Sequence, residues 1–284
     1  MSDPAAPGPL DGLSEDVKAD GVFRAVLEGY DAVYDALPRG ETFNRLWRLN
    51  AYDGGFPEQF AHIGFLTVPE AQRLHELLQI RPGEALADLA CGAGGPGLWM
   101  ARESGASLIG IDPSAAGLAA ARQRARDAGL ASRARFQHGT FEHTNLADGA
   151  AGAVMSIDAF QYAPDKRTAF AEFARIMRAG ARAGIVCFEV DPATVAGLPV
   201  LGVDPVPDYR PLIAAAGLNI EAYEETPGWQ ERVYTAFSAI VDNADTLIAE
   251  MGEQAAAAAV AEAMLTVQMK PYPRRIMAVA SRQR

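Results

Sequence analysis

Apolar residues in the first part of the chain recur every three or four positions, which is the spacing of one face of an α-helix. The pattern extends from Leu13 to about Ile80, with a break at Gly54 and Gly55. After that break we expect a loop that carries His62, and then another helix. The residues that mark the first helical face most clearly are Val22, Phe23, Val26, Leu27, Tyr30, Val33 and Tyr34.

From Gly83 onward short apolar runs alternate with amphipathic stretches, a pattern typical of a parallel sheet with helices on both faces. Ser114 and Asp165 are suitable N-caps for two of the helices, and Gly180 is expected to end the second of them. The predicted strands are 85–89, 107–111, 134–137, 153–157, 184–189, 218–224 and 275–280, and the predicted helices are 95–104, 115–128, 166–178 and 208–216.

This change of pattern divides the chain into two parts. Residues 1–67 predict a flexible N-terminus and a helical lid, and residues 68–284 predict an α/β domain with cap helices at about 227–268. The opening MSDPAAPGPLDG lacks the basic and apolar regions of a signal peptide, and no window approaches the roughly 18 apolar residues of a membrane span. We therefore expect a cytoplasmic protein that does not bind membranes and has a poorly ordered start.

Composition and charge narrow the function further. The formal net charge of -11 opposes nucleic-acid binding, which depends on clustered Lys and Arg. Cys91 and Cys187 both lie in apolar runs, which favours buried thiols, with a disulfide as the alternative. The four histidines are scattered and the cysteines are far apart, so we expect no metal site.

The segment from Ala87 to Gly97, ADLACGAGGPG, follows a predicted strand and opens a predicted helix. An acidic residue before a glycine-rich turn, with a second strand ending in Asp112, is the pattern of a site for an adenosine-containing ligand. NAD and S-adenosylmethionine both contain adenosine. Pro96 removes a backbone N–H where the pyrophosphate of NAD needs one, and the charge of Asp88 repels pyrophosphate but attracts a sulfonium. Both features favour S-adenosylmethionine.

Four blocks in order, DLACGAGGPG, GIDPS, SIDAFQYAPD and RIMRAGARAGIVCFEV, give the chain a family resemblance. From about Val68 to its end the chain resembles class I S-adenosylmethionine-dependent methyltransferases. The AHIGF segment around His62 is similar to the lid element of the sugar and natural-product methyltransferases in this family. The resemblance implies a Rossmann-like, doubly wound seven-stranded sheet with an antiparallel last strand, and S-adenosylmethionine as the cofactor.

The resemblance also implies roles for individual residues. Asp88, Gly92 and Gly94 match the motif that holds the methionine end of the cofactor, and Asp112 matches the residue that binds the ribose hydroxyls. Thr140 stands where the family commonly has an aspartate facing the adenine amine. The expected cofactor-binding residues are Asp88, Leu89, Ala90, Gly92, Gly94, Asp112, Pro113, Thr140, Phe141, Ile157, Asp158 and Gln161.

The implied reaction is an in-line methyl transfer to oxygen, nitrogen or carbon, in which the protein mainly positions the reactants. A general base matters when the nucleophile is a hydroxyl. The sugar O-methyltransferases have a histidine pair after the fourth strand, where this chain has Gln161 and Tyr162. The catalytic candidates are therefore Tyr162, Glu189 and His62, although Glu189 also suits a structural ion pair and His62 also suits packing.

Aromatic residues of the lid and cap predict an apolar or ring-containing small-molecule acceptor, such as a secondary metabolite, although each of them also suits a core position. Two alternatives stay open: a protein of this fold that binds S-adenosylmethionine without methyl transfer, as in a cyclase or a binding role, and an NAD-dependent oxidoreductase. A homodimer also stays open. The aromatic residues are Tyr30, Tyr34, Trp47, Tyr52, Phe56, Phe65, Trp229, Tyr234 and Tyr272.

Overall fold

The computed structural model describes residues 15–52, 54–198, 201 and 203–283, so the expectation for the opening segment lies outside it. Seven strands form one sheet in the order β3-β2-β1-β4-β5-β7-β6. The pairs among β1 to β5 are parallel, and β7 lies antiparallel to both β5 and β6. The predicted fold class is therefore confirmed. The strands are β1 (Ala85–Leu89), β2 (Ser107–Asp112), β3 (Ala134–His138), β4 (Ala151–Ile157), β5 (Met177–Glu189), β6 (Leu218–Glu225) and β7 (Arg274–Arg282).

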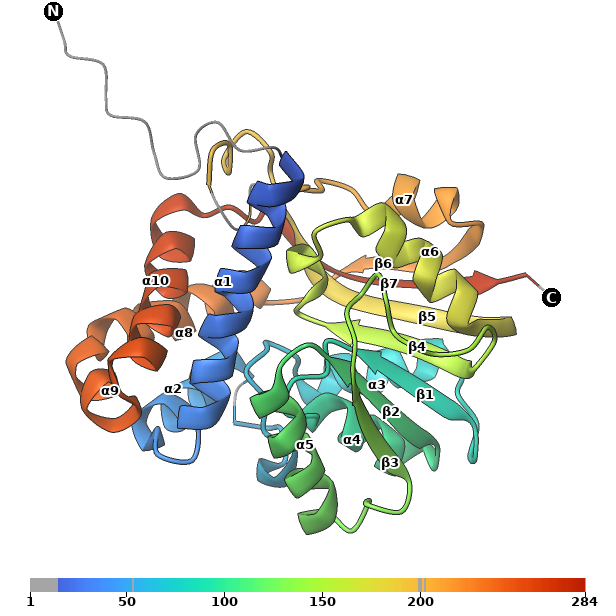
Figure 1. Ribbon diagram of the computed structural model, residues 1–284, viewed down its shortest axis with the longest axis horizontal. Helices are drawn as coiled ribbons and strands as arrows, with labels where there is room; N and C mark the ends of the chain where they lie inside the picture. Colours follow the sequence, from blue (N-terminus) through green and yellow to red (C-terminus); the bar gives the residue numbers. More distant parts are fainter. Residues whose placement is uncertain (1–14, 53, 199–200, 202, 284) are drawn as a thin grey trace, which may run out of the picture.

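Helices cover both faces of this sheet, and a separate group of helices gathers beside it as a cap (Figure 1). One face carries α3 (Val68–Leu78), α4 (Gly95–Ser104) and α5 (Ala115–Asp127), and the other carries α6 (Lys166–Ile176) and α7 (Arg210–Ala215). Apolar side chains fill a core on each face. The cap helices are α1 (Glu15–Ala36), α2 (Glu41–Ala51), α8 (Trp229–Asp242), α9 (Ala244–Met251) and α10 (Glu253–Met269).

Local signals explain where several elements begin. Ser114 and Asp165 accept backbone N–H bonds in the first turns of α5 and α6, as predicted. Thr67 and Glu70 form a reciprocal capping box at the start of α3, an arrangement that satisfies two backbone donors at once. Two short 3-10 turns, η1 (Glu58–Phe60) and η2 (Phe160–Tyr162), lie beside the carboxyl edge of the sheet.

The prediction that the helix after Asp165 continues to Arg178 and ends at Gly180 is wrong. The helix stops at Ile176, and β5 begins at Met177. Met177 pairs with Ala151 of β4, and the register then shifts before β4 and β5 pair again. Gly180 has a φ of 76° and lies in this irregular part of the strand, where a glycine tolerates a left-handed backbone. Strand pairing therefore overrides the helical pattern.

The cap is fastened to the sheet domain through α1. The Ser114 hydroxyl caps α5 by accepting the Gly117 N–H at 2.9 Å, and it donates to the Asp31 carboxylate of α1 at 2.5 Å. Asp31 also accepts the Ala116 N–H at 3.3 Å. Since negative charge is favoured at a helix N-terminus, these contacts hold α1 over the carboxyl edge of the sheet. Within the described parts of the chain, no helix combines the length and apolar character needed to cross a membrane.

Candidate active site

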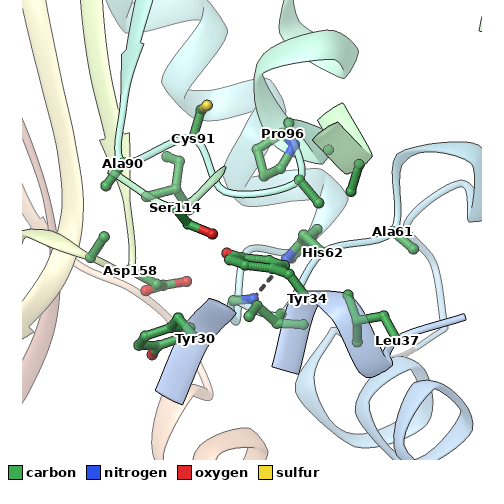
Figure 2. A pocket seen from close by; sticks show the side chains of 18 of the residues that line it. Tyr30, Tyr34, Leu37, Ala61, His62, Ala90, Cys91, Pro96, Ser114 and Asp158 are labelled. Carbon is green, nitrogen blue, oxygen red and sulfur yellow. Dashed lines mark hydrogen bonds between the residues drawn. The ribbon is translucent and has the colours of Figure 1, made fainter. Parts of the chain in front are cut away.

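A cavity of about 960 Å³ lies between the carboxyl edge of the sheet and the cap. Its size is at the upper end of the range for ligand sites, about 300–1,000 Å³. Figure 2 shows side chains from α1 and from the strand ends projecting into the same space. Of the expected cofactor-binding residues, those that line it are Asp88, Ala90, Gly94, Asp112, Pro113, Thr140, Phe141, Ile157 and Asp158.

The glycine-rich turn lets the backbone at the start of α4 lie close to the buried carboxylate of Asp88. Gly94 is the N-cap of α4 and has a left-handed φ of 75°, which glycine adopts without steric cost. A Cβ at Gly97 would collide with the Asp88 carboxylate, so α4 passes directly over this side chain only because residue 97 is glycine. Ala90, before the turn, has a φ of 58°, a strained value for a residue with a side chain.

Asp88 is almost fully buried, with 2% of its surface exposed. Burial, followed by the charge of Asp112, raises its pKa well above the usual value. Two facing carboxylates in a desolvated site favour a cation or hydroxyl donors between them. Asp88 therefore lies ready for a positively charged group of a ligand.

Asp112 is fixed by the turn itself. Its Oδ2 accepts the Gly92 N–H at 2.7 Å, and its Oδ1 accepts the Ser114 N–H at 2.8 Å. Burial raises its pKa to about 6, against these two bonds, which lower it. Each carboxylate oxygen has a further lone pair, so the side chain is able to accept two ligand hydroxyls.

Tyr34 reaches from α1 into the middle of the cavity (Figure 2). A Cβ at Gly92 would collide with its hydroxyl, and this close cover keeps Gly92 itself out of the cavity wall. Burial, followed by the charge of Asp112, raises the Tyr34 pKa well above the usual value. The cap thus places a neutral phenol beside the carboxylates of the sheet edge.

The structure does not bring Leu89 or Gln161 to the cavity wall, contrary to expectation. Leu89 is fully buried in the core on the opposite face of β1, because alternate side chains of a strand point to opposite faces. Gln161 is buried within η2, where its Nε2 donates to the Asp158 carbonyl at 2.9 Å. Thr140 and Phe141 do line the wall, and Phe141 packs against Phe160 with ring centroids 5.2 Å apart.

Asp158 faces the cavity but its carboxylate belongs to a buried ionic network. The Arg275 Nε donates to its Oδ1 at 2.7 Å, and the Phe65 N–H donates to its Oδ2 at 2.7 Å. Arg275, which is completely buried, also contacts Glu70 at 3.1 Å, and Arg232 contacts Glu70 at 2.6 Å. The network joins β4, β7, α3, α8 and the loop before α3. Its one sequence signal is a charge inside the apolar strand RRIMAVA.

His62 lies on that loop between the rings of Tyr52 and Phe56, at centroid distances of 4.6 and 4.7 Å. Its Nδ1 accepts the Gly64 N–H at 3.1 Å, and its buried Nε2 has no partner within the described chain. Burial lowers the pKa of the imidazole to about 4. The neutral ring therefore carries its proton on Nε2 and has no free lone pair with which to act as a base.

Glu189 does not line the cavity. Arg274 contacts both of its oxygens, at 2.6 and 2.7 Å, and the Tyr223 hydroxyl donates to its Oε1 at 2.6 Å. With 1% of its surface exposed and every oxygen engaged, Glu189 occupies the structural ion pair that was the alternative to a catalytic role. We therefore do not retain it as a catalytic candidate.

Tyr162 lines the cavity and donates to a residue that sequence reasoning missed. Its hydroxyl lies 2.6 Å from Oε1 of Glu262 on α10, and the Tyr30 hydroxyl lies 3.4 Å from Oε2 of the same carboxylate. Burial raises the pKa of Glu262, against these two hydrogen bonds. Glu262 lies in an alanine-rich helix 100 residues after Tyr162, and no local motif marks it.

The aromatic residues separate into two groups. Tyr30, Tyr34, Trp47 and Tyr52 line the cavity, whereas Phe56, Phe65, Trp229 and Tyr272 are buried in the core and Tyr234 lies elsewhere on α8. Cys91 and Cys187 are both buried and not bonded to each other. Across the parts of the chain that the structure describes, no three His, Cys, Asp or Glu side chains are grouped so as to hold a metal ion.

Known proteins share both the sequence motifs and the fold. The model of a family described as a methyltransferase domain matches residues 86–180, which include the glycine-rich turn, Asp112 and Tyr162. The methyltransferase GfsG of Streptomyces halstedii is 26% identical over 86% of this chain and 89% of its own length. The 27-O-demethylrifamycin SV methyltransferase of Amycolatopsis mediterranei (strain S699) is 26% identical over 71% of this chain and 78% of its own.

Among solved structures, the cyclase SpnF superposes with a TM-score of 0.62 over 75% of this chain and 80% of its own, at 20% identity. That similarity concerns the fold. The domain match, the two related methyltransferases and the acidic residues at the ends of β1 and β2 agree on the chemistry. Residues 86–180 thus match a methyltransferase domain, and the chain is similar to methyltransferases over most of its length.

Proposed function

We propose that the protein transfers a methyl group from S-adenosylmethionine to a small, largely apolar organic acceptor. The observation that carries this proposal is the cavity itself, where Asp88 and Asp112 face a wall of aromatic and aliphatic side chains from the cap. The carboxylates suit a cationic, hydroxyl-bearing cofactor, and the apolar wall suits an acceptor with rings or long carbon chains. The name of the rifamycin relative supports a secondary metabolite as the acceptor.

The residues present fit the cofactor. In this proposal Asp112 accepts the ribose hydroxyls, Asp88 faces the methionine ammonium, and Gly94 lets the chain pass close beneath. When bound, S-adenosylmethionine supplies an electrophilic methyl on a positively charged sulfur. Thr140 and Phe141 border the space for the adenine, and the neutral His62 is a candidate hydrogen-bond donor rather than a base.

The cap contributes binding energy and excludes water. Apolar side chains of α1, α2 and the segments that follow them line the cavity, and burying them against an acceptor is favourable by about 25 cal/mol per Å². Holding both reactants in one closed space supplies much of the rate enhancement expected of a displacement reaction. The apolar side chains are Phe23, Val26, Leu27, Leu37, Pro38, Trp47, Leu49 and Ile63.

Calorimetric titration with S-adenosylmethionine, S-adenosylhomocysteine and NADH tests the cofactor. We expect the first two to bind and NADH not to bind. Incubation with S-adenosylmethionine carrying a ¹³C-methyl group, together with a panel of acceptors, tests the transfer. Binding of the cofactor with no label transfer to any acceptor would contradict the proposed activity and favour a cyclase or binding role.

A further inference from the structure

We propose that Glu262, acting through Tyr162, takes up the proton of the acceptor, and that the acceptor group is therefore a hydroxyl. This inference rests on the proposed methyl transfer and identifies its nucleophile. The pair consists of a phenol in the cavity wall and a carboxylate directly behind it.

The geometry supports proton transfer along this pair. Tyr162 follows β4, in the part of the cavity that also contains Ile157 and Asp158. Its hydroxyl proton points to Glu262 at 2.6 Å, within the reach required of a general base. The phenol oxygen keeps lone pairs with which to accept a hydrogen bond from an acceptor hydroxyl, and the Tyr30 and Tyr272 phenols lie beside the same oxygen. Tyr30 holds the other carboxylate oxygen at 3.4 Å and keeps the carboxylate in place.

The charges around Glu262 suit a group that gains and loses a proton. The titratable side chains that face it are three phenols, Tyr30 on α1, Tyr162 on η2 and Tyr272 on the segment before β7. Among the residues that the structure describes, no Lys, Arg or His side chain shifts the pKa of its carboxylate. Burial without a cation makes the proton affinity of a carboxylate higher than usual, which suits a base working near neutral pH.

A second tyrosine–glutamate pair, Tyr223 with Glu189, differs from the Tyr162–Glu262 pair in its charge and position. Tyr223 donates to Glu189 at the same distance of 2.6 Å, but Arg274 neutralises that carboxylate with two further bonds, and Glu189 does not line the cavity. A carboxylate paired with arginine is a poor proton acceptor because the ion pair stabilises its charged form. The Tyr162–Glu262 pair has the opposite character, since Tyr162 lines the cavity and no cation in the described part of the chain shifts the pKa of Glu262.

In the proposed reaction the methyl group moves to the acceptor oxygen and the acceptor proton moves towards Glu262. The acceptor oxygen attacks the methyl carbon, and the bond from that carbon to sulfur breaks with both electrons remaining on a neutral thioether. The acceptor O–H proton passes to the Tyr162 oxygen while the Tyr162 proton passes to Glu262. Glu262 later releases this proton to water. A neutral amine attacks without losing a proton first, so a buried relay of this kind is most useful to a hydroxyl.

The test uses the full chain with ¹³C-methyl-labelled S-adenosylmethionine and acceptors matched in carbon skeleton as alcohol, phenol, amine and activated carbon. NMR distinguishes O-methyl, N-methyl and C-methyl products. We expect O-methyl products only, and a decrease in kcat of about 10²-fold to 10⁴-fold in both Tyr162→Phe and Glu262→Gln, the range for loss of a general base. Tyr223→Phe, which removes the same bond from the pair outside the cavity, should retain the wild-type kcat.

The pH profile separates a proton relay from a structural role. In the wild type kcat should fall as Glu262 becomes protonated at low pH, and this limb should disappear from the residual activity of Glu262→Gln while its affinity for S-adenosylmethionine is retained. N-methyl or C-methyl products, or full kcat in both cavity variants, would overturn the relay but leave methyl transfer intact. No label transfer to any acceptor would overturn the proposed function together with the inference.

Discussion

The two walls of the cavity are built in different ways. The wall at the sheet edge comes from strand ends that the parallel register brings together, since Leu89 pairs with Ile111 and so places Asp88 near Asp112. The opposite wall comes from α1, α2 and η2, and its Tyr162 hydroxyl donates to Glu262 of α10, 100 positions later. The first wall is local and specified by a motif, whereas the second exists only once the chain has folded.

The chemistry of the walls differs in a corresponding way. At the sheet edge two carboxylates face each other and are poised for a ligand with a positive charge and hydroxyl groups. At the cap the Glu262 carboxylate lies among phenols, and within the part of the chain that the structure describes no cation shifts its pKa. The neighbours of each carboxylate therefore differ, and in the proposed function this difference suits Asp88 and Asp112 to the cofactor and Glu262 to the acceptor.

The largest loss of stability should come from breaking the buried ionic network around Arg275. Arg275→Met leaves Asp158 and Glu70 without their shared cation in a buried site, and loss of one partner of such a network costs about 3–5 kcal/mol. Urea unfolding should show this as a large fall in the free energy of unfolding. Arg210→Met, which removes an exposed pair with Asp208, should have a much smaller effect, because exposed ion pairs contribute little to stability. Equal losses in the two variants would contradict a structural role for the buried network.

The protonation of His62 should affect how the free energy of unfolding depends on pH. Its pKa is lowered from 6.5 to about 4 in the folded protein, so the unfolded chain binds a proton first as the pH falls. The contribution of His62 to the free energy of unfolding is complete above pH 6.5. It decreases by about 3 kcal/mol as the pH falls towards 4. Asp112, whose pKa is raised to about 6, acts in the opposite direction and regains stability over a similar range. His62→Gln should remove the acid-sensitive part of unfolding curves measured between pH 4 and 7, and an unchanged curve would refute the assignment.

The sheet-edge wall is tested by cofactor affinity. Asp112→Ala removes the carboxylate that would accept the ribose hydroxyls, and hydrogen bonds to a charged group contribute about 1.5–3 kcal/mol. We expect calorimetry to show a loss of about 100-fold in affinity for S-adenosylmethionine. Asp127→Ala, which changes an exposed aspartate bonded to Gln123 at the end of α5, is the matched control. If Asp112→Ala binds S-adenosylmethionine with wild-type affinity, the proposed role of Asp112 in cofactor binding is wrong.

The smallest effect should be found at the tyrosine–glutamate pair outside the cavity. Tyr223→Phe removes one hydrogen bond to Glu189 and another to the Tyr209 N–H, but Arg274 continues to neutralise the carboxylate. We expect a loss of about 1–3 kcal/mol in the free energy of unfolding, with no change in the affinity for S-adenosylmethionine. A loss of cofactor binding here would break the distinction between the cavity and its surroundings.

The sequence predicted the sheet, and most of the residues it proposed for the cofactor line one cavity, because these features depend on short-range patterns. Alternating apolar runs, caps such as Ser114 and the turn around Gly94 each act over a few residues. The end of α6 was predicted wrongly because pairing with β4 decides the state of Met177. Glu262 was missed because a charged residue in a helix ordinarily indicates a solvated face, and only the packing of α10 against α1 reverses that expectation.

The attachment of α1 to the start of α5 links the order of the lid to occupancy of the site. The Ser114 hydroxyl contacts Asp31, and the Ser114 N–H contacts Asp112, so one residue joins the lid to the carboxylate proposed to hold the ribose. A ligand that binds only while α1 is docked makes undocking costlier by RT ln(1 + [L]/Kd). Amide hydrogen exchange in α1 should therefore slow as the cofactor concentration rises. The exchange rate of this helix would then report the fraction of the protein that has cofactor bound.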